Sequence, residues 1–270
     1  MFAAMRAGAP AGVAAAAARA PRRERPRAMR VVVVSDTHGR HGKLPPLPGG
    51  DVLIHAGDFT ARGAAEEVAP FARWLASLEQ YKHKLVCAGN HELCLDASYS
   101  GSGLAALRCE RELKSDAARA AGVTYLKNAG ITIDGVSFWA SPMTPRFGPW
   151  AFAHEDAAQA RAEWARIPEG TDVLITHGPP RGILDLCWNG ARAGCEELRK
   201  RVDALRPAAM VFGHIHEAAG VHTQDDTLFV NASSVNLNYD VDVCTDSPRG
   251  VVVFDVVEAG RATLVRPSSL

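Results

Sequence analysis

The sequence predicts an α/β fold built on two mixed β-sheets, in a single domain that follows a basic N-terminal segment. In the first half of the chain, short β-branched apolar runs alternate with segments of helical spacing, whereas the second half is richer in strands. A chain of 270 residues, 47% of them hydrophobic, can build one substantial core. No internal repeat or linker divides the later part of the sequence. We therefore expect one domain over residues 29–270.

Residues 1–28 consist mainly of alanine, arginine, glycine and proline, with few large apolar side chains. Such a segment cannot bury enough apolar surface to fold. It is either a disordered basic segment or an organellar transit peptide, since transit peptides are rich in arginine and poor in acids. Met29 directly precedes the first predicted strand, which favours the disordered segment. The expected location is cytoplasmic, with an organelle as the alternative if residues 1–28 are a transit peptide.

The charge of the chain is unevenly distributed. Residues 1–30 carry seven arginines and one acid, so the rest of the chain has a net charge of −6. An acidic body argues against a nucleic-acid surface and suits a site that gathers cations. No apolar run is long enough to span a membrane, so no membrane partner is expected. The six cysteines form no C-x-x-C pair, which favours reduced thiols and argues against a thiolate zinc site.

The predicted elements of the first half alternate between strand and helix. Apolar runs that end in polar loops predict buried strands, at Arg30–Ser35, Asp51–His55 and Lys84–Ala88. Apolar residues at helical spacing predict two helices, at Ala64–Gln80 and at Gly103–Ala121, where Gly122 ends the second.

The second half begins with a change of period. Residues Gly130–Ala140 alternate around Asp134-Gly135, which predicts a β-hairpin. Helices are predicted at His154–Arg166 and Gly194–Leu205. Strands are predicted at Thr171–Thr176, Ala208–Phe212, Thr227–Asn231 and Gly250–Val257.

Five of these strands end in short glycine-containing loops that carry potential metal ligands. A single histidine at a strand end is usually a structural residue, but five such loops at the same strand end predict a metal site. The residues are Asp36, His38, Asp58, Asn90, His91, His177, His214 and His216.

The ligand types indicate which metals the site would hold. Oxygen ligands mixed with imidazole, without thiolate, suit Mn, Fe or Zn better than Ca, and Mg is also possible. Seven candidate ligands remain when His91 is left aside, and seven are too many for one ion. Two ions about 3.5–4 Å apart, with one bridging carboxylate, would use them all. We therefore expect a dinuclear metal centre.

The order of these motifs is D-x-H, G-D, G-N-H-E, H and G-H-x-H, and it resembles that of the calcineurin-like metallophosphoesterase superfamily over Met29–Asn231. The segments THGPPRGILD, CWNGARAGCEEL and FGHIHEAAG look like the brain protein 239-like branch of metallophosphoesterase-domain proteins. The resemblance implies a four-layer αββα sandwich of two mixed sheets flanked by helices. It also implies a metal-dependent phosphoric ester hydrolase, because that branch is associated with cyclic nucleotide phosphodiesterase activity.

The resemblance also implies a role for each residue. One ion would be held by Asp36, His38, Asp58 and His216, and the other by Asp58, Asn90, His177 and His214. Asp58 would bridge the ions, and Asn90, His91 and His214 would contact the substrate. A metal-bridging hydroxide would attack the phosphorus while His91 assists the leaving group, a task that suits the ordinary histidine pKa. Asp58 and His91 are therefore the expected catalytic residues.

The expected function is phosphodiester hydrolysis of small substrates, with cyclic nucleotides first among them. Alternatives are a phosphomonoesterase or protein phosphatase on the same site, or a catalytically weak nucleotide-binding or scaffold protein. Protein phosphatases of the superfamily carry an arginine before G-N-H-E, whereas Ala88-Gly89 precede Asn90 here. Arg62-Gly63 does keep their spacing, which leaves that alternative open. The sequence does not predict an oligomeric state.

Several nearby side chains allow two interpretations each. Glu92 either orients a neighbouring group or lies at the surface, and His55 is expected to be packed rather than a ligand. Aromatic side chains in the loop before residue 153 either stack on a base or cap the core, namely Phe147, Trp150 and Phe152. Two arginines either contact phosphate or are solvated, namely Arg146 and Arg181.

Overall fold

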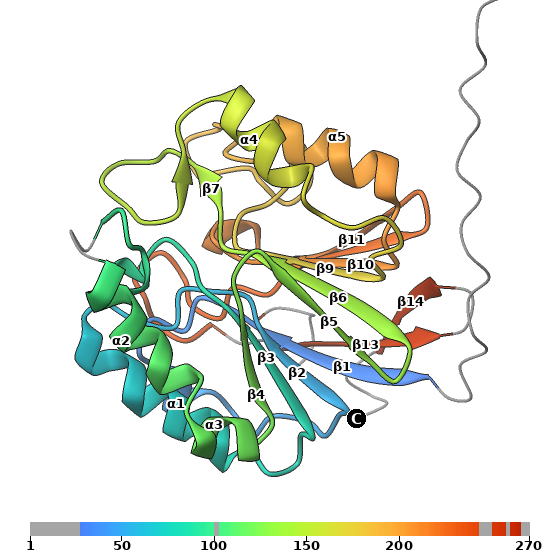
Figure 1. The fold of residues 1–270 in the computed structure, drawn as a ribbon. Helices are drawn as coiled ribbons and strands as arrows, with labels where there is room; N and C mark the ends of the chain where they lie inside the picture. Colours follow the sequence, from blue (N-terminus) through green and yellow to red (C-terminus); the bar gives the residue numbers. More distant parts are fainter. Residues whose placement is uncertain (1–27, 100–102, 243–249, 258–259, 266–270) are drawn as a thin grey trace, which may run out of the picture.

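The computed structural model describes residues 28–99, 103–242, 250–257 and 260–265. Two six-stranded sheets pack face to face, with helices on both outer faces (Figure 1). The predicted four-layer α/β sandwich is therefore confirmed. The basic segment predicted over residues 1–28 lies, apart from Ala28, outside the described residues. No helix among the described residues is long and apolar enough to cross a membrane.

Sheet one contains the first four strands and the last two of the chain. Its parallel strands β1 to β4 are extended by β13 and β14, which run antiparallel to their neighbours. The strand order is β14-β13-β1-β2-β3-β4, with bounds β1 Met29–Val34, β2 Val52–His55, β3 His83–Cys87, β4 Val123–Leu126, β13 Val252–Val257 and β14 Arg261–Leu264.

Sheet two is built from the middle of the chain. Four of its strands are parallel, and the hairpin strand β5 and the edge strand β11 run antiparallel to them. The order is β11-β12-β10-β9-β6-β5, with bounds β5 Ala129–Ile133, β6 Val136–Ser141, β9 Val173–Thr176, β10 Ala209–Phe212, β11 Gly220–Gln224 and β12 Thr227–Asn231. A small separate sheet pairs β7 Thr144–Pro145 with β8 Ala153–His154.

Helices cover the outer face of each sheet (Figure 1). Sheet one carries α1 Val68–Ser77, α2 Gly103–Leu113 and α3 Asp116–Ala120, and sheet two carries α4 Ala157–Trp164 and α5 Glu196–Leu205. Short 3-10 turns are η1 His41–Lys43, η2 Ala65–Glu67, η3 Leu93–Leu95 and η4 His216–Ala218.

Strand β1 shows how the sequence of a strand places its side chains in the layers of the fold. Successive side chains of a strand point to opposite faces of the sheet. Val31 and Val33 accordingly pack between the two sheets. Val32 and Val34 pack under the helices of sheet one. The strand is buried on both faces, which explains its uninterrupted run of valine.

Two predicted helices differ from the observed ones. The helix predicted over Gly103–Ala121 is two helices, because Ser115 is extended and its hydroxyl accepts a hydrogen bond from Ala118 N–H, which caps α3. The helix predicted from His154 begins at Ala157, because His154 pairs in β8 and Asp156 caps α4. The other predicted elements are present with ends shifted by a few residues, which is the usual uncertainty at such boundaries.

Candidate metal centre

The predicted ligands come together where the two sheets meet. The residues Asp36, His38, Asp58, Asn90 and His91 follow β1, β2 and β3 of sheet one, and His177, His214 and His216 follow β9 and β10 of sheet two. Carboxyl ends of parallel strands share one edge of a sheet. The edges of the two sheets are joined by a bridge between Ser35 and Ser233. Residues separated by up to 180 positions therefore meet in one cluster.

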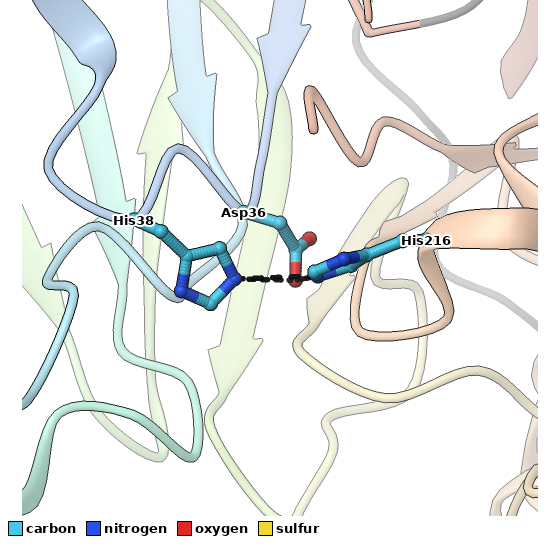
Figure 2. Close-up of side chains that lie close together, drawn as sticks. All are labelled: Asp36, His38 and His216. Carbon is cyan, nitrogen blue, oxygen red and sulfur yellow. Dashed lines mark hydrogen bonds and ion pairs between the residues drawn. The ribbon is translucent and has the colours of Figure 1, made fainter. Parts of the chain in front are cut away.

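The first group in this cluster consists of Asp36, His38 and His216, whose ligand atoms lie within 4.8 Å of one another (Figure 2). Nε2 of His216 is 3.3 Å from Asp36 Oδ1 and 3.2 Å from Nε2 of His38. Two imidazole nitrogens and a carboxylate oxygen that converge in this way match the ligand set of one divalent cation.

The second group consists of Asp58, His177 and His214, again within 4.8 Å. Nε2 of His177 is 3.3 Å from Asp58 Oδ2 and 2.9 Å from Asn90 Oδ1, so the amide oxygen of Asn90 joins this group. Asp58 also lies 3.8 Å from His38 of the first group. Its position between the two groups is the one that a bridging carboxylate requires.

The outer ring nitrogens are held by backbone carbonyls. Nδ1–H of His177 donates to Ala56 O at 3.0 Å, and Nδ1–H of His216 donates to Asn236 O at 3.3 Å. These bonds fix the tautomer and leave Nε2 directed at the carboxylates. Metal-ligating histidines are oriented in the same way.

The backbone of the ligand loops is strained. Asp36, His38, Asp58 and His214 have φ values of 51°, 43°, 54° and 71°, a region that non-glycine residues seldom occupy. Such conformations cost about 1–3 kcal/mol each and persist where the surrounding structure holds them, often at functional sites.

Glycines flank the ligands because other atoms approach the chain closely. A Cβ at Gly213 would lie 1.8 Å from Asp36 Oδ2, and one at Gly89 would lie 2.3 Å from Asp58 Oδ1. Neither position has a positive φ, so the requirement here is space beside the ligands.

Glu92 orients the ligand loops, which resolves one alternative left open by the sequence. It is fully buried, and its carboxylate accepts hydrogen bonds from Asp58 N–H at 2.9 Å and Gly89 N–H at 2.6 Å. It also accepts from Thr60 N–H at 2.9 Å and from the Thr60 hydroxyl at 2.8 Å. The loops after β2 and β3 are therefore joined through one side chain.

Replacing Glu92 with glutamine should loosen this junction. The amide nitrogen would face donors, so we expect a loss of about 2–4 kcal/mol in the free energy of unfolding. Metal affinity should fall about 10–100-fold, as for other residues that support ligands. Denaturant unfolding and metal titration measure the two effects. The matched control is Glu110→Gln, a buried glutamate on α2 that pairs with Lys114 and Lys127, which should lower stability without changing metal affinity.

Asp36 is supported by Ser233, a residue that the sequence did not single out, and by the backbone of His214. The Ser233 hydroxyl donates to Asp36 Oδ2 at 3.0 Å, and His214 N–H lies 3.0 Å from both Asp36 oxygens. Ser233 follows β12 without a distinctive motif, so only the paired sheets reveal its contact with the loop after β1.

The two buried carboxylates of the cluster have pKa values that depend on the positive charge of neighbouring groups. Burial would raise the pKa of Asp36 and of Asp58, but the neighbouring histidines hold both pKa values below their usual range. Burial likewise would lower the pKa of His177, yet the charge and hydrogen bond of Asp58 raise it to about 9. By contrast, burial dominates for His38 and lowers its pKa to about 4.

The family model for calcineurin-like phosphoesterase matches residues 29–218, which span every predicted ligand. The chain belongs to this family. Metallophosphoesterase domain-containing protein 1 from human is 40% identical over 224 residues, covering 78% of this chain and 67% of that protein. The UPF0046 protein K07C11.7 from Caenorhabditis elegans is 40% identical over 218 residues, covering 77% and 70%. The predicted family resemblance is thus confirmed.

Solved structures support the fold of this phosphoesterase. The crystal structure of TT1561 from Thermus thermophilus aligns with a TM-score of 0.56 at 11% identity, covering 89% of this chain and all of that one. At this identity the likeness concerns the fold alone.

The family implies a pair of metal ions, and the described residues fit them. Within the described chain, every ion pair of Asp36 and Asp58 is with a histidine. Buried carboxylates are normally neutralised by cations or by metals. The donor set of carboxylate, amide and imidazole is suited to divalent cations that the phosphoesterase would bind.

Metal binding to this phosphoesterase should release protons. His177, with a pKa raised to about 9, carries a proton at pH 7, and a protonated imidazole cannot bind a metal. The apparent metal affinity should therefore fall up to about tenfold for each unit that the pH drops below 9. Calorimetry at pH 7 in buffers of different ionisation enthalpy should show at least one proton released per chain. A pH-independent affinity between pH 7 and 9 would contradict this.

A cavity of about 520 Å³ is lined by several of the predicted metal ligands. Its base includes Asp58, Asn90, His91, His214 and His216, and its walls include Arg146, Phe147, Trp150, Arg181, Trp188 and Tyr239. The catalytic and substrate-contacting residues predicted from the sequence all lie at this base. Trp188 belongs to the segment CWNGARAGCEEL, to which the sequence assigned no role, and Tyr239 lies outside the motifs, so their place in the wall could not be predicted.

The structure also decides between the two interpretations that the sequence left open for other nearby side chains. Phe152 is buried in the core of sheet one, and His55 is packed, with Nε2 3.0 Å from the Thr37 hydroxyl. Arg146 lines the cavity but is bound to Glu155, and Arg181 lines it but donates to Arg192 O at 2.6 Å. Each guanidinium therefore already has a hydrogen-bond partner, which limits its capacity to bind a phosphate group.

Proposed function

We propose that the chain is a dimetal-dependent phosphodiesterase of small substrates, with cyclic nucleotides as the first candidates. The observation that supports this most directly is the place of Asp58, which lies between two ligand groups at the base of a cavity and beside His91. Two bound divalent cations would supply a low-pKa water as nucleophile and positive charge for the phosphoryl oxygens.

The residues of the chain divide this work. One cation would be held by Asp36, His38, Asp58 and His216, and the other by Asp58, Asn90, His177 and His214. His91 would give a proton to the leaving oxygen. Nδ1–H of His91 donates to Ala61 O at 3.0 Å, so Nε2 is the nitrogen from which that proton would pass. Asn90, His91 and His214 line the cavity base, where they would contact the phosphoryl group.

The cavity favours a small substrate with a flat apolar part. Phe147 and Trp188 are exposed in its wall and offer aromatic faces to a nucleobase. Arg62, whose spacing left a protein phosphatase open, is not among the described residues that line the cavity. This favours a diester of small size over a phosphoprotein.

A panel of 2′,3′- and 3′,5′-cyclic nucleotides, nucleotide monoesters and bis-aryl diesters, each with Mn, Fe, Zn or Mg, tests the proposal. We expect metal-dependent turnover of diesters, faster than that of monoesters. Faster turnover of monoesters would indicate a phosphomonoesterase. No turnover of any ester by protein with its metals bound would indicate a nucleotide-binding or scaffold protein.

A further inference from the structure

The imidazole ring of His91 is restrained from several directions. Nδ1–H donates to the Ala61 carbonyl at 3.0 Å. The ring of His38 meets it edge-on, with centroids 4.5 Å apart and an interplanar angle of 78°. The indole of Trp150 stacks on it, with centroids 4.1 Å apart and an interplanar angle of 18°.

Trp150 is itself held in place by the loop between β7 and β8. Ala151 N–H donates to Asn90 O at 3.1 Å, next to His91 in the chain. Phe152 N–H donates to Asp96 Oδ2 at 2.7 Å, and the ring of Phe152 is buried in the core of sheet one. Arg146 Nη1 donates to Trp150 O at 3.1 Å. The residues on both sides of the indole are thus fixed against the loop that carries His91.

A hydrogen bond at one ring atom does not by itself fix the plane of an imidazole. The χ2 torsion of histidine is broad, so the ring can turn while Nδ1 stays near its partner. Proton transfer requires Nε2 within about 2.6–3.2 Å of the oxygen that receives the proton. A flat contact over the ring face restrains the motion that the hydrogen bond leaves free.

We propose that Trp150 is a positioning residue, which holds the His91 ring so that Nε2 faces the leaving oxygen of the substrate. This inference rests on the proposed role of His91. As the bond from phosphorus to the leaving oxygen breaks, the proton passes from Nε2 to that oxygen. The ring is left neutral with its remaining proton on Nδ1, bonded to Ala61 O.

A series of diesters whose leaving groups differ in basicity tests this role. A basic leaving group, such as an alkoxide, must be protonated as it departs, whereas p-nitrophenolate is stable enough to leave almost without a proton. We expect Trp150→Ala to lower kcat about 10–100-fold for alkyl and phenyl leaving groups, part of the effect of general acid catalysis. The loss for p-nitrophenolate should be about threefold or less, with KM and metal content unchanged. Trp150→Phe, which keeps a flat ring, should restore most of the rate.

Trp188→Ala is the matched control, since it removes an exposed indole from the same cavity. Trp188→Ala should change kcat by the same factor for every leaving group. In a His91→Ala background, Trp150→Ala should cause little further loss, because the two residues act as a unit. An equal loss across leaving groups for Trp150→Ala, or additive losses in the double variant, would overturn the proposal.

A second measurement separates this inference from the proposed function. In metal-free protein with 15N-labelled histidine, the hydrogen-bonded Nδ1–H of His91 should give a resolved NMR signal that Trp150→Ala broadens or shifts and Trp150→Phe retains. An unchanged signal in Trp150→Ala would overturn the positioning role even if the wild type is active. If the signal changes but no ester is hydrolysed by the wild type, the proposed function fails while the restraint on the ring stands.

Discussion

Replacing His91 with alanine should lower kcat for diester hydrolysis about 10²–10⁴-fold and leave the metal content unchanged. The ring lines the cavity base, and its Nδ1 is occupied by Ala61 O, so its catalytic use depends on Nε2. The backbone N–H of His91, which donates to Asp58 Oδ1 at 2.8 Å, is retained in the variant. Metal analysis and steady-state kinetics on the same sample measure both quantities.

The control for this variant is His222→Ala, an exposed histidine on β11. It should leave both turnover and metal content at the wild-type level. Loss of both metals from His91→Ala would contradict the role given to His91 and would make it a ligand instead.

Replacing Asp58 with asparagine should remove at least one of two bound metals and lower kcat by about 10³-fold or more, beyond the 10–100-fold typical of residues that only support ligands. Asp58 belongs to the second ligand group and lies 3.8 Å from His38 of the first, and an amide offers neither the charge nor the second oxygen that a bridge needs. The same change weakens the contact with His177. Metal stoichiometry by mass spectrometry and kinetics at saturating metal give the two results.

Asp255→Asn is a suitable comparison for Asp58→Asn. This carboxylate pairs with Arg30 on sheet one and belongs to neither ligand group. The variant should retain two metals and full turnover. If Asp58→Asn also retains two metals, Asp58 does not bridge them.

The clustering of the predicted metal ligands could be foreseen because the position of each at a strand end depends on local sequence. A short apolar run such as Arg30–Ser35 marks a strand, and a ligand directly after it lies at the strand end whatever the tertiary fold. Exposed edge strands were not predictable in this way. Strands β11 and β14 consist only of exposed and half-buried residues and lack a continuous apolar run.

The residues that support the ligands depend on contacts between distant segments. Glu92 is the last residue of the G-N-H-E motif, but only the close approach of the loop after β2 shows that its carboxylate receives four hydrogen bonds. Trp150 follows His91 by nearly 60 positions, in a loop rich in proline and glycine. Nothing in the local pattern distinguishes a ring that stacks on His91 from one that caps the core.

The pairing of β1 has a consequence for the order of folding. On one side β1 pairs with β2, which follows it closely in the chain, but on the other side Met29 pairs with Val256. All of sheet two lies between these partners in the sequence. Until β13 docks, one edge of β1 stays unpaired, which exposes it to wrong association. Contacts of such long range also slow folding. The pairing of the strand that leads into Asp36, although it is the first strand in the chain, is therefore complete only once β13 has docked.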